Sequence, residues 1–328
     1  MRSATSWPAI DPRVRYLGSR ILQGLFVIWA AFSLTFLMLW WLPGDAVVAR
    51  LGGTGEGADV PPEQVAALRA EYGLDRPLPV QYGEQLRGLA TGDLGVSVRT
   101  GVPVTEVIGG ALPPTLLLAA TALGGAVLAG TLFALVATAV PGRVARRVLI
   151  GLPAVGISVP TFWVGLVLLT VFSFQLRWFP SVGDAGPAGL VLPSVTLALP
   201  AGAMYTQMLI ASMRESLAEP FVETARMKGL GPVAVHVRHA ARTALVPPVT
   251  MLGLLVGNVV AGAVVIETVF SRAGLGRVTV DAVDLQDIPV IQGLVVVGAV
   301  VYVLAGLLVD LLYPVLDPRV RLTSGAGR

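Results

Sequence analysis

Six apolar runs, each long enough to form a helix that crosses a membrane, constrain this 328-residue chain more than any other feature. They span residues 21–42, 112–140, 148–174, 190–210, 249–266 and 290–309. A helix rises about 1.5 Å per residue, so about 20 apolar residues cross the hydrocarbon of a bilayer. The sequence therefore predicts an all-α polytopic membrane protein with six transmembrane helices. In the fourth run, Pro193 and Pro200 predict kinks or ragged ends.

The overall composition and the placement of basic residues support this prediction. Only 13% of the residues are charged, against about a quarter in soluble globular proteins. Of the 23 Lys and Arg residues, 15 lie in residues 1–20, 142–147, 211–246 and 314–328. Cytoplasmic loops carry an excess of these residues, so we expect both termini to be cytoplasmic. One lysine against 22 arginines is typical of a GC-rich bacterial genome, so the expected location is the bacterial plasma (inner) membrane.

The expected domain organisation follows from these spans and charges. It comprises a cytoplasmic N-terminal tail (1–20), a transmembrane domain (21–312) with an external loop (43–111) and a cytoplasmic loop (213–247), and a cytoplasmic C-terminal tail (313–328). Membrane lipid is an expected partner. Nucleic acid is not, because no dense basic stripe with interleaved aromatic residues occurs.

The cytoplasmic loop 213–247 carries the start and stop signals of a short helix. The signals are, in order, Glu219, Pro220, Glu223, Arg226, Lys228 and Gly229. Proline suits a first helical turn, acidic residues suit the positive end of the helix dipole, and basic residues suit the negative end. The glycine supplies a left-handed residue that closes the helix. A second helix is expected from about Gly231 to Ala244, so the loop predicts a helix-turn-helix at the membrane surface.

On the first of these helices, small and apolar residues are expected to share one side. Phe221, Val222 and Ala225 follow i, i+3 and i+4 spacing. Ala225 and Gly229 would leave room for another backbone to come close. This shape predicts a plug that fits into a partner.

The six runs contain none of the groups that usually drive uphill transport. No Asp, Glu, Lys, Arg or His lies in their interiors, although proton- and ion-driven transporters usually bury such residues. The only lysine, Lys228, is followed by glycine and fits no phosphate-binding loop. If transport is uphill, we therefore expect the energy to enter from a partner through the loop 213–247.

The pattern Glu223-x-Ala225-x-x-x-Gly229 resembles the E-A-A-x-x-x-G loop of permease subunits of ATP-binding-cassette (ABC) importers. The phrases E-T-A-R-M-K-G-L and H-A-A-R-T-A-L-V-P resemble the peptide and nickel branch, in particular the B-type dipeptide/oligopeptide permeases. Similar phrases occur at residues 73–82, 92–97, 158–169, 176–183, 267–277, 287–293 and 309–321. The resemblance therefore covers nearly the whole chain.

The resemblance implies a type I ABC importer permease fold and a non-catalytic subunit without a cofactor of its own. It implies a second homologous permease subunit, one or two cytosolic ABC ATPase subunits that hold ATP and Mg²⁺, and an extracytoplasmic solute-binding protein. Alternating access to di- or oligopeptides is the implied mechanism, with nickel chelates or another small polar solute as the alternative. The residues implied in ATPase coupling are Glu219, Phe221, Glu223, Thr224, Ala225, Arg226, Lys228, Gly229 and Leu230.

Uncharged polar groups at membrane depth are candidates for the translocation path, because each needs some partner there. They are Thr161, Thr206, Gln207 and Asn258. The phrase L-P-G-D-A (42–46) leads into the external loop, in which Pro62 to Tyr72 predicts a short helix. The loop as a whole predicts either a docking surface for a soluble delivery protein or a structural cap. His236 and His239 could bind a metal at i, i+3 spacing or lie on a solvated helix face. A passive channel and an intramembrane enzyme remain competing functions from the residues alone.

Overall fold

The structure is a computed structural model that describes residues 12–41, 62–71, 75–181, 183 and 186–316. Within these residues the chain is nearly all helical, and its one β-bridge pairs Val96 with Pro103. The helices are α1 (Pro12–Trp41), α3 (Pro62–Glu71), α4 (Leu78–Thr91), α5 (Val104–Ala139), α6 (Arg143–Ser158), α7 (Thr161–Leu168), the π-helix η1 (Leu169–Gln175), α8 (Gly186–Ala218), α9 (Pro220–Met227), α10 (Pro232–Ala234), the π-helix η2 (Val235–Ala240), α11 (Ala241–Ala244), α12 (Val246–Val269), α13 (Leu275–Asp284) and α14 (Ile288–Leu316).

Five helices are long and apolar enough to cross a membrane. They are residues 18–39 of α1, the whole of α5, α8 and α12, and residues 288–308 of α14. These confirm five of the six predicted spans. In the fourth predicted span, Pro193 and Pro200 both lie inside the single α-helix α8.

The third predicted span, residues 148–174, is not one straight helix. It divides into α6 and the α7–η1 pair, which meet at an angle of 96°. The break falls at Val159, whose backbone is extended (φ −87°, ψ 130°). Pro160 explains this conformation, because the proline ring disfavours helical geometry in the residue before it.

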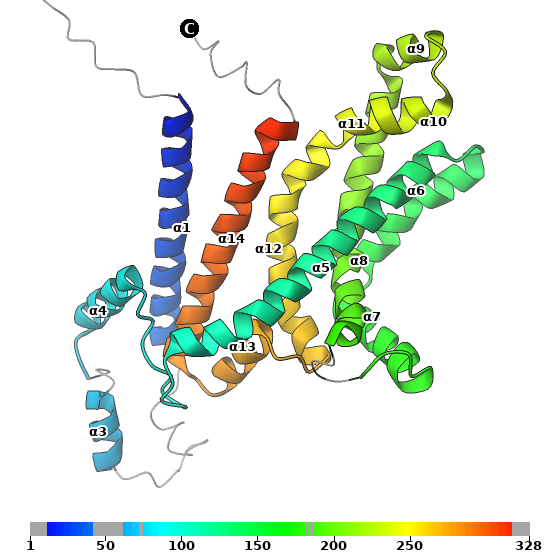
Figure 1. Ribbon diagram of the computed structural model, residues 1–328. Coiled ribbons are helices and arrows are strands. Elements are labelled where there is room, and N and C mark those ends of the chain that lie inside the picture. Colours follow the sequence, from blue (N-terminus) through cyan, green and yellow to red (C-terminus); the bar gives the residue numbers. More distant parts are fainter. Residues whose placement is uncertain (1–11, 42–61, 72–74, 182, 184–185, 317–328) are drawn as a thin grey trace, which may run out of the picture.

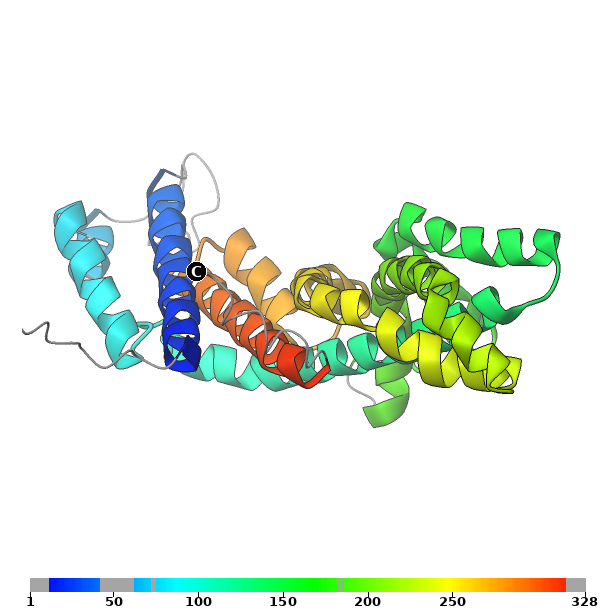
Figure 2. The ribbon, with the colours of Figure 1, turned by 90° about the horizontal axis from the view of Figure 1, so that it is seen from above.

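The helices form an elongated layer, with α1 and α4 towards one end and α6 and α8 towards the other (Figure 2). The core joins α5 and α8 through small residues that recur every fourth position of α5. These are Ala122, Ala126, Gly130 and Ala134, all buried. A Cβ atom on Gly130 would come within 2.7 Å of the hydroxyl oxygen of Thr206 and 2.9 Å of the Tyr205 ring. Close backbone approach through small residues is the usual way in which helices associate in membranes.

Along the axes of the long helices, the layer has two opposite ends that carry different elements (Figure 1). At one end, which we call the α9 end, lie α9, α10, the start of α1 and the end of α14. At the opposite end, the α13 end, lie α13, the end of α1 and the start of α14. The loop 213–247 is therefore on the same side of the bundle as the start of α1 and the end of α14.

Candidate functional site

At the α9 end, helix α9 has the boundaries that its sequence predicts. Pro220 is its first residue, and Glu219 before it is extended (φ −71°, ψ 146°). Gly229 adopts a left-handed conformation (φ +82°). The amide of Gly229 donates to the carbonyl of Arg226 at 2.9 Å, and the amide of Leu230 donates to the carbonyl of Ala225 at 3.3 Å. These two bonds form a Schellman motif, in which glycine avoids the cost of a Cβ atom.

The buried side of α9 faces the chain itself. Val222 is 1% exposed, and with Ala225 it packs against Val235 of η2. In the structure, the close neighbour of Ala225 is therefore η2 of the same chain. Phe221, expected on the same side, is 39% exposed. Val235 of η2 covers Val222 and Ala225 but not Phe221. The spacing within α9 alone does not reveal which of these residues η2 covers.

The exposed side of this segment presents apolar residues among charged ones. We call Phe221, Met227, Leu230 and Val233 the apolar tip; all four are exposed, Met227 by 78%. The predicted coupling residues around it are exposed as well, namely Glu219, Glu223, Thr224, Arg226, Lys228 and Gly229. Several exposed apolar side chains on one short segment, with polar residues among them, form a candidate interaction surface. The arrangement is therefore suited to a partner with an apolar groove and a charged rim.

Specific contacts attach this segment to the bundle. The hydroxyl of Ser216, near the end of α8, donates to the carbonyl of Ala240 at 3.0 Å. His236 Nε2 lies 2.8 Å from the hydroxyl of Thr138, near the end of α5. Ala240, Ala241 and Ala244 are buried in the same cluster as Met213 of α8. Because α11 leads directly into α12, a displacement of the tip would reach α5, α8 and α12.

The histidines of this segment bear on the open alternative of a metal site. His236 is partly buried beside Thr138, and burial lowers the pKa of its imidazole from the ordinary value of 6.5. His239 Nδ1 lies 3.5 Å from the carbonyl of Ala234. In the part of the chain that the structure describes, no three His, Cys, Asp or Glu side chains come together as a metal site would require. His236 therefore serves as a contact between η2 and α5.

At the α13 end, a buried carboxylate joins three helices. Glu267 follows the fifth predicted span, residues 249–266, but α12 continues to Val269 and includes it. Its carboxylate accepts hydrogen bonds from the Thr115 hydroxyl at 2.6 Å and from the Gly276 amide at 2.6 Å. The Thr115 hydroxyl in turn accepts from the amide of Leu275 at 2.8 Å. These bonds cap the start of α13 and fix it to α5, so Glu267 has a structural role.

The external loop is described in part. The predicted helix from Pro62 to Tyr72 is confirmed as α3, which ends at Glu71, whereas the L-P-G-D-A phrase lies outside the described residues. Helix α4 was not predicted, although its proline at the second position and Gly92 after its end are recognisable start and stop signals. It packs on α1, where the Tyr82 ring contacts Phe32 and Phe36.

The four candidates for a translocation path differ in exposure. Thr206 is buried and donates to the carbonyl of Gly202 at 2.6 Å. Its hydroxyl therefore already has a hydrogen-bond partner within α8, where α8 packs on α5. Thr161 is half-buried at the start of α7, and Gln207 and Asn258 are exposed. Asn258 belongs to an exposed stripe along α12 with spacings of four and three residues. The stripe is Leu254, Asn258, Ala261, Val265 and Thr268, a spacing typical of helices that pack against a partner helix.

Comparisons with known proteins match the chain along nearly its whole length. Residues 126–322 match the family "Binding-protein-dependent transport system inner membrane component", and residues 13–119 match its N-terminal component. A probable peptide ABC transporter permease protein, y4tP of Sinorhizobium fredii, is 36% identical over 93% of this chain and 99% of its own length. The glutathione transport system permease protein GsiC of Salmonella choleraesuis is 36% identical over 94% of this chain and 99% of its own length.

A solved structure also resembles the chain. It is an inward-facing form of the MetNI methionine ABC transporter, with a TM-score of 0.47 and 15% sequence identity. The match covers 65% of this chain and 94% of that chain.

Proposed function

This chain belongs to the family of binding-protein-dependent transport system inner membrane components, and we propose that it is the permease subunit of an ATP-driven importer of peptides. The relatives match over 99% of their own length, so the resemblance is not confined to one segment. These relatives are named as permeases for a peptide and for glutathione, which is itself a modified tripeptide. Peptides are therefore a better-supported cargo than nickel chelates, and an importer is better supported than a channel or an intramembrane enzyme.

The single observation that carries the proposed mechanism is the apolar tip at the α9 end. We infer that it docks into a groove of a cytosolic ATPase, with Phe221 and Met227 in the groove and Glu223, Arg226 and Lys228 at its rim. The buried contact of Val222 and Ala225 with Val235 keeps α9 rigid. A force on the tip then passes through Ser216 and His236 to α8 and α5. ATP and Mg²⁺ would be held by the ATPase, and both termini would be cytoplasmic.

A second permease subunit is part of the same proposal. The exposed stripe of α12 that contains Asn258 offers a packing surface for it, and Gln207 on α8 is exposed too. The two permeases would enclose the cargo path and open it alternately to each side. A solute-binding protein would deliver peptide at the α13 end.

Reconstitution tests this function. The complete complex, with its ATPases, second permease and binding protein, is placed in proteoliposomes, and uptake of a labelled peptide library is measured with and without ATP. Uptake is expected only with ATP and with all subunits present. If this chain alone concentrates peptides in sealed vesicles, or if the complex takes up nickel chelates and ignores peptides, the proposal is wrong.

A further inference from the structure

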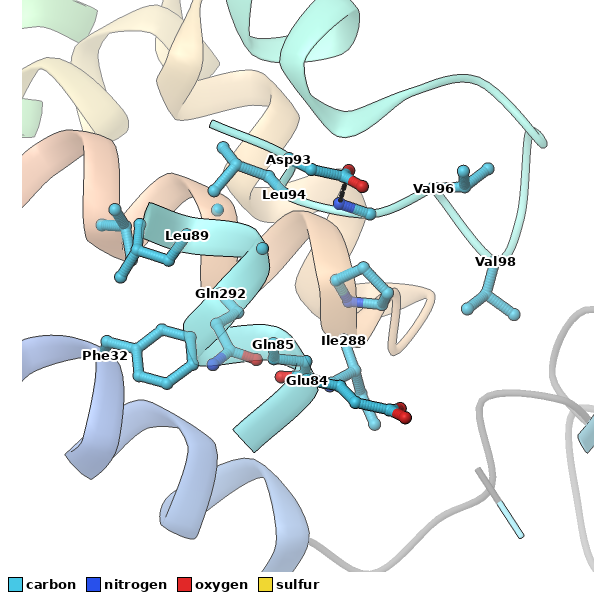
Figure 3. A pocket seen from close by; sticks show the side chains of 15 residues that line it. Phe32, Glu84, Gln85, Leu89, Asp93, Leu94, Val96, Val98, Ile288 and Gln292 are labelled. Atoms are coloured by element: carbon cyan, nitrogen blue, oxygen red, sulfur yellow. Dashed lines mark hydrogen bonds between the residues drawn. The ribbon is translucent and has the colours of Figure 1, made fainter. Parts of the chain in front are cut away.

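A cavity of about 250 Å³ lies towards the α13 end, between α1, α4, the turn 93–98 and the start of α14 (Figure 3). Its walls are held by contacts on both sides. On the α4 side, the hydroxyls of Ser33 and Tyr82 are hydrogen-bonded at 2.8 Å. On the α14 side, the Asp287 carboxylate accepts hydrogen bonds from the Ser97 hydroxyl and the Val98 amide. The cavity is thus built by residues far apart in the sequence and does not depend on a bound molecule.

Two amide side chains in this cavity have atoms without a partner among the described residues. Gln85 Oε1 and Gln292 Nε2 are both buried and form no hydrogen bond. Gln292 is only 6% exposed, and the two side chains lie close together beside Phe32 (Figure 3). Leaving a buried donor or acceptor without a partner costs free energy, and such groups are rare unless they serve a ligand or water. These two atoms therefore indicate a place where a ligand binds.

The chemistry of the two atoms specifies the ligand. A glutamine Oε1 only accepts hydrogen bonds and a glutamine Nε2 only donates them. An ion of either sign would satisfy one of the two atoms and not the other. A peptide group has one N–H donor and one C=O acceptor, so it can satisfy both at once. This pair of unpartnered atoms consequently favours a peptide group over a simple ion.

The rest of the lining favours an amino terminus over a carboxylate. Most of it is apolar, including Phe32, Leu89, Leu94 and Val98, while its two charged residues are Glu84 and Asp93. Among the described residues that line the cavity, there is no Lys, Arg or His. Glu84 is paired with Arg76 at the rim, and Asp93 accepts a hydrogen bond from the Gly95 amide. Because Arg76 already compensates the charge of Glu84, the Asp93 carboxylate is the group that attracts an ammonium ion and repels a free carboxylate.

We propose that this cavity binds the amino-terminal end of a short peptide. The first peptide group bonds to Gln85 and Gln292, and the terminal ammonium lies on the Asp93 side of the cavity. The volume corresponds to about eight water molecules at ~30 Å³ each, which is space for a fragment of about two small residues. The inference deepens the proposed function and rests on it for the identity of the peptide as cargo. Binding itself is a property of this chain and is testable without transport.

The test uses the purified full chain in lipid nanodiscs and three probes. The first is glycyl-leucinamide, which has an ammonium group and a peptide N–H and no carboxylate. The second is the matched ester, in which oxygen replaces the peptide N–H, and the third is the N-acetylated amide. Binding of each is measured by saturation-transfer NMR. We expect the first probe to bind, and the ester and the acetylated probe to bind at least tenfold more weakly.

Variants locate the site. Gln292→Leu is expected to weaken binding of glycyl-leucinamide at least tenfold, whereas Gln175→Leu, which alters an exposed glutamine of η1 away from the cavity, is expected to leave it unchanged. Because Gln292 Nε2 has no partner to lose, the leucine variant should melt no lower than the wild type without ligand. Gln85→Leu repeats the test from the α4 side if the Gln292 variant fails to fold.

Three results would overturn the inference: no binding by the wild type, equal binding of amide and ester, or unchanged binding by both cavity variants. The first would mean that the cavity holds water only. Because none of these measurements involves ATP or uptake, they can fail while peptide import succeeds. Conversely, binding with the expected selectivity in a complex that imports no peptide would contradict the proposed function and leave the cavity site intact.

Discussion

The hydroxyl of Ser97 donates a hydrogen bond to the carboxylate of Asp287, which lies 190 residues further along the chain. The same carboxylate accepts from the backbone amides of Val98 and Arg99, at 3.2 and 3.5 Å. Asp287 is buried and directly precedes the first residue of α14. It therefore fixes the turn after α4 to the start of the last helix, and through that turn it forms one wall of the cavity.

Replacing Asp287 by alanine is expected to destabilise the protein. It would leave the Ser97 hydroxyl and the Val98 amide buried without their acceptor, and each such loss costs about 1–3 kcal/mol. The measurement is thermal unfolding in detergent, with Asp284→Ala as the control because Asp284 is an exposed carboxylate on the adjacent helix. Equal melting temperatures for the two variants would show that the Asp287 contacts contribute nothing.

Gly276→Ala is expected to be far more damaging than a glycine-to-alanine change at a helical position with open space around it. A Cβ atom at this position would lie 2.4 Å from the Cα atom of Val264 and 2.8 Å from a carboxylate oxygen of Glu267. The backbone of α12 would have to move, and the hydrogen bond that starts α13 would be lost. Folded yield and melting temperature measure the effect.

Gly125→Ala is the matched control for this prediction. Gly125 lies inside α5 with nothing within 4 Å of an added Cβ atom. Alanine there should stabilise the helix by about 0.5–1 kcal/mol, because it reduces the freedom of the unfolded backbone. If Gly276→Ala is tolerated as well as Gly125→Ala, then α13 does not pack closely on α12.

The contact between η2 and α5 should depend on pH through His236. In the folded protein, burial lowers the pKa of His236 below its ordinary value of 6.5. The imidazole therefore binds a proton more readily in the unfolded state. Stability from this group is therefore complete above about pH 6.5 and is lost as the pH falls from there through the folded-state pKa. His236→Gln should reduce the loss of melting temperature between pH 7.5 and pH 5, values chosen to bracket the ordinary histidine pKa of about 6.5.

His239→Gln controls for the general effect of acid, because it removes the other histidine of the same π-helix. It should leave the pH dependence close to that of the wild type. A His236→Gln variant that loses stability with acid as steeply as the wild type would exclude His236 as the responsible group.

Local signals made some of these features predictable from the sequence. The proline and glycine that bound α9 act within a few residues, so they specify the helix without the rest of the fold. The five spans that each form a single helix follow from the length of their apolar runs. Pro160 carries a local signal too, but an apolar run of 27 residues across it, 148–174, concealed the bend.

Features that depend on distant residues could not be predicted in this way. The burial of Val222 and Ala225 requires Val235, which a separate helix supplies. The bonds that join Ser97 to Asp287 and Thr115 to Glu267 have no counterpart in the sequence near either residue. The phrases at residues 92–97 and 287–293 resemble the same family separately, and only the fold shows that they meet.

The apolar tip gives the last prediction, which concerns coupling. The double variant Glu223→Ala/Gly229→Val should abolish both ATPase association and peptide uptake while leaving membrane insertion intact. Gly229 has a φ of +82°, and a β-branched side chain there costs about 1–2 kcal/mol, so the turn after α9 would change. Loss of Glu223 removes negative charge from the exposed rim. Co-purification with the ATPase and uptake by cells are the measurements.

A second pair of variants separates loss of the surface from loss of the fold. Met227→Asp places a charge on the exposed tip and should weaken ATPase binding without lowering the melting temperature, because Met227 is 78% exposed. Val222→Asp buries a charge against Val235 and should lower the melting temperature, so any loss of ATPase binding by this variant reflects loss of the fold. If Met227→Asp and Glu223→Ala/Gly229→Val both retain the ATPase and normal uptake, the α9 end is not where the energy of ATP hydrolysis enters this subunit.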